Sequence, residues 1–148
     1  MPVRSGAVLF MAAALCGGGL MSAARGNHMA AEAPRTIASG VYTDEQATRG
    51  MKAFIRNCSA CHGEQFNGAE SGPPLIDGLI ERWKGKSVAD LFEKIRTTMP
   101  PLPDTPGKLG DQGYADVTAA ILKANGEPAG PAELPSDPAA LAAIIMDR

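Results

Sequence analysis

The stretch Cys58-Ser59-Ala60-Cys61-His62 is the most informative part of this sequence. Two cysteines separated by two residues and followed by a histidine form the attachment pattern of a c-type haem. The spacing has a chemical reason, because each thiol forms a thioether with one haem vinyl group and the adjacent imidazole then serves as the proximal iron ligand. The motif predicts one covalent haem c on Cys58 and Cys61, with its iron bound by His62.

Zinc sites and thioredoxin-like redox sites also use paired cysteines. A structural zinc site needs a second pair of ligands, and the rest of the chain offers only Cys16 and His28, both near the N-terminus. A thioredoxin-like pair lies between a strand and a helix, and the sequence has no strand-rich pattern. We therefore favour the haem interpretation over these two alternatives.

The composition is consistent with a bound macrocycle. A chain of 148 residues is long enough for one domain with appendages. Only 5% of the residues are aromatic, which is little for a core of the ordinary type. A covalently attached haem would supply the missing apolar bulk.

Residues 1–24 have the pattern of an export signal. Arg4 precedes an apolar stretch over residues 7–15, and Ser22-Ala23-Ala24 resembles a peptidase cleavage site. The apolar stretch is shorter than the roughly 20 residues that a transmembrane helix needs, so we favour cleavage over retention as an anchor. Cleavage would remove Cys16, and the haem would then use both of the remaining cysteines. The mature protein would lie in the periplasm without stable membrane insertion.

The formal net charge of −2 gives no basic excess that would suggest a nucleic-acid partner. A modest cationic cluster is formed by Arg82, Lys84, Lys86, Lys94 and Arg96. It is suited to docking an acidic partner, although we favour an ordinary solvated helix face.

Helical periodicity predicts an all-α domain over residues 43–126, a small bundle of about three to five helices. The first helix is expected from Thr43 to Asn57, with a Thr43–Gln46 capping box at its start. Its predicted buried face consists of Ala47, Gly50, Met51, Phe54 and Ile55.

A glycine- and proline-rich loop over residues 63–80 excludes a long regular element. A second helix is expected from Ser87 to Thr98, and a third from Asp111 to a stop at Asn125-Gly126. The third helix should pack through Tyr114, Val117, Ala120, Ile121 and Ala124.

The two ends of the mature chain lack this periodicity. Residues 25–42 are interpreted as a linker, and residues 127–148 as a proline-rich tail. Asp137 or Ser136 is placed to cap a short final helix covering Ala139 to Met146.

Met99 is the best candidate for the second iron ligand. It follows a predicted helix end and precedes Pro100, which stiffens the main chain beside it. A thioether stabilises ferrous iron and raises the reduction potential, which suits electron transfer. The alternative is that Met99 fills a gap in the core, as methionine often does.

With these residues in view, the chain resembles a class I c-type cytochrome over about residues 43–126. The resemblance rests on the helix that leads into the haem motif, Gly72-Pro73-Pro74-Leu75, Met99-Pro100, and the final helix. More narrowly, Arg96-Thr97-Thr98-Met99-Pro100, Ala124-Asn125-Gly126 and Glu133-Leu134-Pro135 look like cytochromes associated with quinoprotein alcohol dehydrogenases.

The resemblance implies three further roles. The first and last helices would cross at Gly50 and Phe54, and a carbonyl of Pro73 or Pro74 would accept a hydrogen bond from the proximal histidine. Trp83 would pack beside the haem and reach a propionate through its indole N–H, or else be a partly buried core aromatic. Many relatives have a tyrosine where this chain has Ala120, so the packing there must be completed differently.

The expected function is periplasmic transfer of single electrons, not catalysis. The donor would be a periplasmic dehydrogenase, with a quinoprotein alcohol dehydrogenase as the candidate. Whether the protein is a free carrier or a subunit of a dehydrogenase complex stays open. The acceptor would be a terminal oxidase or another cytochrome. The alternatives are a haem-containing catalytic subunit and a redox or gas sensor, both of which need a labile distal ligand.

Overall fold

The computed structural model describes residues 35–101 and 106–148, which lie in the unit formed by residues 31–148. The predicted signal and residues 25–34 of the predicted linker fall outside the described residues. In the described ranges, none of the helices is long and apolar enough to cross a membrane.

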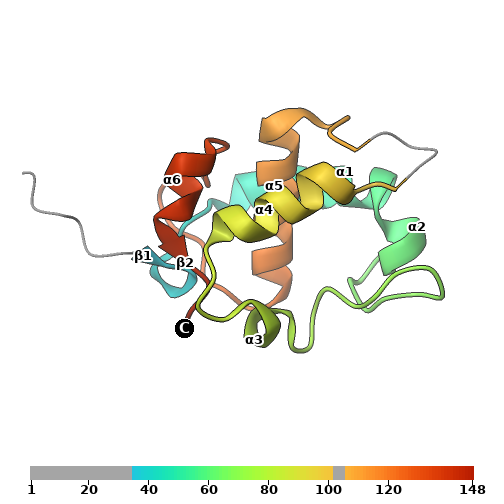
Figure 1. The fold of residues 1–148 in the computed structure, drawn as a ribbon, viewed down its shortest axis with the longest axis horizontal. Coiled ribbons are helices and arrows are strands. Elements are labelled where there is room, and N and C mark those ends of the chain that lie inside the picture. Colours follow the sequence, from blue (N-terminus) through green and yellow to red (C-terminus); the bar gives the residue numbers. More distant parts are fainter. Residues whose placement is uncertain (1–34, 102–105) are drawn as a thin grey trace, which may run out of the picture. The chain divides into compact units, whose positions relative to one another are not determined.

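The described chain is mostly helical, as predicted (Figure 1). The six α-helices are α1 (Asp44–Asn57), α2 (Ser59–His62), α3 (Leu79–Trp83), α4 (Val88–Thr98), α5 (Gly110–Ala124) and α6 (Pro138–Ala142). A 3-10 turn, η1 (Ile37–Ser39), follows the short strand β1 (Arg35–Thr36), which pairs in parallel with β2 (Ile144–Ile145). The small all-α class expected for a c-type cytochrome is therefore confirmed.

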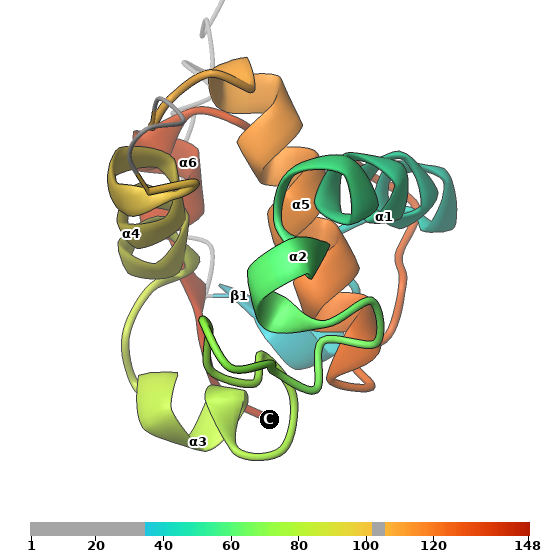
Figure 2. The ribbon, with the colours of Figure 1, turned by 90° about the vertical axis from the view of Figure 1, so that its right-hand side faces the viewer.

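Helices α1 and α5 cross in close contact at Gly50 (Figure 2). A Cβ atom at this position would lie 1.8 Å from the carbonyl oxygen of Asp116 on α5. Only glycine leaves room for the two backbones to approach so closely. Phe54, one turn later, is fully buried beside Val117 and Ile121.

The buried face of α1 differs from the prediction by a small rotation. Ala47, Gly50 and Phe54 are buried as expected, together with Gln46, whereas Met51 and Ile55 are 38% and 39% exposed. Successive residues are about 100° apart around the helix axis, so a buried face centred on Gly50 leaves Met51 and Ile55 pointing outward. Ala124, also predicted to pack, is exposed on α5.

The capping box predicted for α1 forms only in part. The Thr43 hydroxyl accepts from the Gln46 amide at 3.1 Å. The Gln46 side chain does not return the bond, because it donates to the Leu134 carbonyl at 2.9 Å and accepts from the Leu134 amide at 2.6 Å. The complete box forms at α4, where the Ser87 hydroxyl accepts from the Asp90 amide and the Asp90 carboxylate from the Ser87 amide.

Both segments outside the predicted domain fold onto it. Of the predicted linker, Ile37, Val41 and Tyr42 are buried in the core. The tail covers the same core through Leu134, Leu141, Ile144 and Met146, each no more than 1% exposed. Its helix α6 is capped by Asp137, one of the two predicted caps, and is shorter than expected.

Gln46→Ala should therefore loosen the tail. The substitution leaves both buried main-chain groups of Leu134 without partners, so we expect the free energy of unfolding to fall by about 2 kcal/mol. Denaturant unfolding of the haem-loaded protein measures the change, with Gln65→Ala, at an exposed position, as the control. Equal effects of the two substitutions would show that the Gln46–Leu134 pair does not hold the tail.

Candidate haem site

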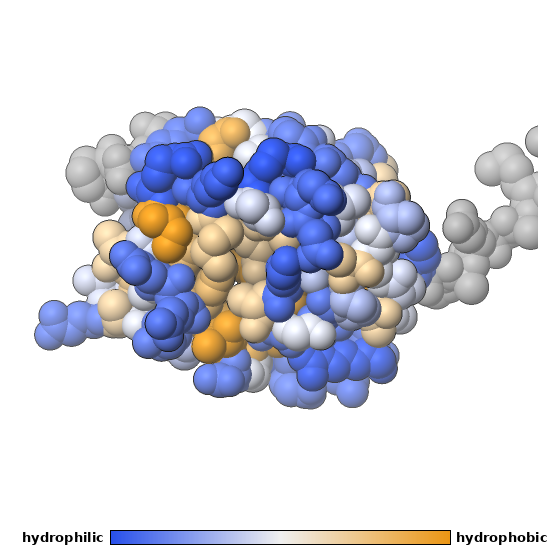
Figure 3. Space-filling view, turned by 180° about the vertical axis from the view of Figure 1, so that it is seen from behind, coloured by the Kyte–Doolittle hydropathy of each residue, from blue (hydrophilic) through white to orange (hydrophobic). Residues whose placement is uncertain are grey.

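All six residues proposed for the site from the sequence line one cavity of about 590 Å³. This volume falls within the range of roughly 300–1,000 Å³ that is typical of cofactor sites. The six are Cys58, Cys61, His62, Pro74, Trp83 and Met99. Most of the remaining wall is apolar and includes Phe54, Leu75, Leu79, Leu91, Ile95, Val117 and Ile121. Figure 3 shows apolar side chains gathered at a hollow in a largely hydrophilic face.

A single helical turn presents the two thiols and the imidazole together. Cys58 ends α1, with its amide donating to the Phe54 carbonyl at 2.8 Å. The chain turns immediately into α2, and the His62 amide donates to the Cys58 carbonyl at 3.0 Å. Gly63 then ends α2 with a φ of 73°, and a Cβ there would lie 2.4 Å from the Asn67 side chain.

The histidine predicted to be the proximal ligand is fixed by a main-chain carbonyl. His62 is 8% exposed, and its Nδ1 lies 2.8 Å from the Pro73 oxygen. A carbonyl can only accept, so Nδ1 carries the proton and Nε2 is left to bind a metal. Such a bond orients the ring and raises its basicity as a ligand.

Of the two prolines considered as acceptor, the structure selects Pro73. Pro74 lies on the cavity wall, and its carbonyl instead faces Arg82 at 3.4 Å. The cause is the close approach of Gly72 to the haem motif, since a Cβ there would lie 2.7 Å from the Cys61 oxygen. This contact brings the next carbonyl along the chain, that of Pro73, beside the imidazole.

The Cys58 thiol does not have the character of a thioredoxin-like redox cysteine. Burial raises the pKa of Cys58 to about 11, an effect that Lys108 partly offsets. A redox-active cysteine of that class needs a lowered pKa, because the thiolate is its reactive form. The turn that carries the two cysteines also follows a helix directly, not a strand.

Met99 lies immediately after α4 and lines the same cavity as His62. Its amide donates to the Ile95 carbonyl at 2.9 Å, which ends the helix, and its own main chain is extended, as expected before a proline. Figure 2 shows α4 and α2 as well-separated elements. The structure therefore brings an imidazole and a thioether to one cavity from two separate elements.

Phe66 completes the packing beside Ala120, a role that our sequence reasoning missed. Its ring stacks on Phe54 with the centroids 4.0 Å apart, and Ala120 belongs to the same buried cluster. An aromatic residue within the mostly polar, glycine-rich stretch over residues 63–72 was the signal that could have identified it.

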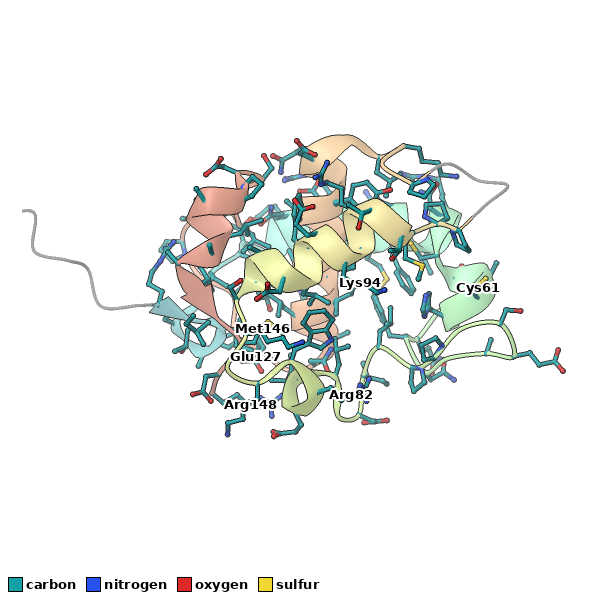
Figure 4. All side chains as sticks on the ribbon, viewed as in Figure 1. Cys61, Arg82, Lys94, Glu127, Met146 and Arg148 are labelled. Carbon is teal, nitrogen blue, oxygen red and sulfur yellow. The ribbon has the colours of Figure 1, made fainter. Side chains whose placement is uncertain are left out.

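The predicted cationic cluster is divided in the structure. Arg82 and Lys94 line the cavity, and Figure 4 shows them on α3 and α4, with Cys61 on α2. Such cations suit the carboxylates of haem propionates. The Lys86 Nζ lies 4.9 Å from the centre of the Trp83 ring. Arg96 pairs with Glu93 at 2.9 Å and Lys84 with Asp147 at 3.7 Å.

A comparison with models of protein families matches residues 45–119 to the family described as cytochrome C oxidase, cbb3-type, subunit III. The chain belongs to this family. The matched part is a c-type cytochrome domain, so the protein is a haem-based electron-transfer protein with covalently bound haem c and redox protein partners. No curated protein and no solved structure matched the chain.

The cavity of this cytochrome fits the haem that the family implies. It offers two thiols for the vinyl groups, an imidazole with a free Nε2, a thioether, an apolar wall and two cations. Each of these groups matches a part of the cofactor.

Gly72→Ala should disturb this site. The added Cβ would press on the Cys61 oxygen and lie 3.1 Å from the His62 Nδ1, so Pro73 must move away. We expect a loss of roughly 1–3 kcal/mol in the free energy of unfolding, with a lower yield of haem-loaded protein. Glu70→Ala, in the same loop and at an exposed position off the cavity wall, is the control. Unchanged haem loading and stability in Gly72→Ala would contradict the tight contact.

Proposed function

We propose that this cytochrome is a periplasmic carrier of single electrons with one haem, ligated by His62 and Met99. The observation that carries the proposal is the presence of both side chains on the wall of one cavity. When bound, the haem supplies a reversible one-electron couple. His62 and Met99 would both hold the iron in each oxidation state, so little movement would be needed when an electron is transferred.

The chain's own residues would divide the remaining work. Cys58 and Cys61 would attach the cofactor, and the carbonyl of Pro73 would keep His62 oriented through the bond at 2.8 Å. The apolar wall would exclude water, while Arg82 and Lys94 would face the propionates. Trp83 would pack beside the ring system as part of the same wall.

We propose a periplasmic dehydrogenase as the electron donor, with a quinoprotein alcohol dehydrogenase as the candidate. The short sequence matches around Met99 and Glu133 support an association with quinoprotein alcohol dehydrogenases. The matched family is described as a subunit of an oxidase, which supports a terminal oxidase as the acceptor. Weak, transient contacts over a small interface are the mode expected for such partners.

The predicted ligand role of Met99 can be tested with carbon monoxide. At low carbon monoxide concentrations that saturate Met99→Ala, the absorption spectrum of the reduced wild-type holoprotein should not change, because the Met99 thioether would already hold the iron. Met99→Ala should bind carbon monoxide readily, while Met51→Ala, at an exposed methionine of α1, should behave like wild type. Rapid and complete binding by the wild type at these low concentrations would favour a catalytic or sensor function over a carrier.

Export predicts a mature holoprotein that begins after residue 24 and carries one haem. The intact mass of the holoprotein purified from whole cells, with the soluble and membrane fractions combined, measures both features. A mass that includes residues 1–24 would instead support retention of the leader as an anchor.

A further inference from the structure

We propose that Tyr114 is a positioning residue for the methionine ligand, and that its hydroxyl determines how firmly the Met99 sulfur stays on the iron. The inference rests on the proposed function, in which Met99 is that ligand. Tyr114 does not line the cavity itself. It acts through the main chain of Met99.

The Tyr114 hydroxyl joins two main-chain groups that lie outside its own helix. It donates to the Met99 carbonyl at 2.7 Å and accepts from the Gly107 amide at 2.9 Å. The side chain projects from the first turns of α5 and is 1% exposed. The tyrosine is therefore shielded from water, while its two bonds are part-buried. Leaving either partner unpaired carries a cost.

Met99 is consequently held on both sides of its α-carbon. Its amide is bound to Ile95 on α4, and its carbonyl to Tyr114 on α5. Because different helices fix the two polar main-chain groups, the position from which the Met99 side chain enters the cavity is fixed before the thioether binds the iron. A thioether that is already positioned loses less conformational freedom on binding the metal than a freely moving one, so its bond to the metal is stronger.

Partners behind a metal ligand usually affect binding strongly. Removing one typically costs about 10–100-fold in metal affinity. An external ligand competes with Met99 for the iron, so a weaker methionine bond appears as tighter binding of that ligand. Tyr114→Phe should therefore raise the apparent affinity of the reduced holoprotein for carbon monoxide by about tenfold.

The chain provides a matched control, because it has two tyrosines. Tyr42 is also 1% exposed, belongs to the same core cluster, and donates its hydroxyl to a main-chain carbonyl, that of Glu127. Its bond lies in the tail and does not involve Met99. Tyr42→Phe removes the same chemical group at the same burial and should leave the iron ligands unchanged.

The experiment compares haem-loaded wild type, Tyr114→Phe and Tyr42→Phe. We would measure carbon monoxide affinity, equilibrium unfolding, and the upfield-shifted methyl signal of an iron-bound methionine in the proton NMR spectrum. Both variants should lose some stability, but only Tyr114→Phe should bind carbon monoxide about tenfold more tightly. Equal carbon monoxide binding by the two variants would overturn the inference while leaving the ligand assignment intact. Absence of the methyl signal in wild type would overturn both.

A second measurement needs no variant. Coupling between two sites is reciprocal, so displacing Met99 with saturating carbon monoxide should weaken the bonds of Tyr114. The Gly107 amide should then exchange its hydrogen faster, while the Gly130 amide, which donates to the Tyr42 carbonyl at 2.7 Å, should not. Unchanged exchange at Gly107 would overturn the inference.

Discussion

The close crossing of α1 and α5 is the constraint on which the site depends. The contact at Gly50 fixes the line of α1, and α1 ends at the first cysteine of the haem motif. The other helix supplies Val117 and Ile121 to the cavity wall and Tyr114 to Met99. One contact between two backbones therefore sets the separation between the helical turn that carries the two cysteines and the side chains that α5 contributes to the site.

The tail reinforces this crossing by binding to both helices. Gln46 of α1 pairs with the main chain of Leu134, and Arg49 joins Asp116 of α5 to Glu133. At the end of the chain, the Arg148 guanidinium donates to Glu127 at 2.6 Å, a carboxylate that is almost fully buried. A charge in such a place is stable only when it is paired. These polar contacts fix the course of a segment with little regular structure.

The sequence predicted those parts of the structure that depend on local chemistry. Helix α4 begins beside Ser87 and ends before Met99, because a cap and a proline mark its limits. The motif and Met99 were also recognisable, and the structure places them on one cavity. Which residues bind the iron stays a prediction.

Features that arise from contacts distant in sequence were missed. Gln46 has the right type and spacing to complete a capping box, but Leu134 takes its side chain instead. Phe66 and the segment from Ile37 to Tyr42 have no periodicity, so their burial could not be read from the pattern. Met51 and Ile55 match the helical spacing of a core face, yet the crossing at Gly50 turns them outward.

Segments from both ends of the described chain cover the core. The part of the chain that folds together is therefore larger than the part that the family model matches. The family match spans residues 45–119, yet Tyr42, Leu134 and Met146 lie in the same buried cluster as Tyr114 and Leu122. A fragment trimmed to the matched range would expose this apolar surface to water and lose the partners of Gln46. Transplanting this haem domain into another protein would therefore require its flanking segments as well as the matched range.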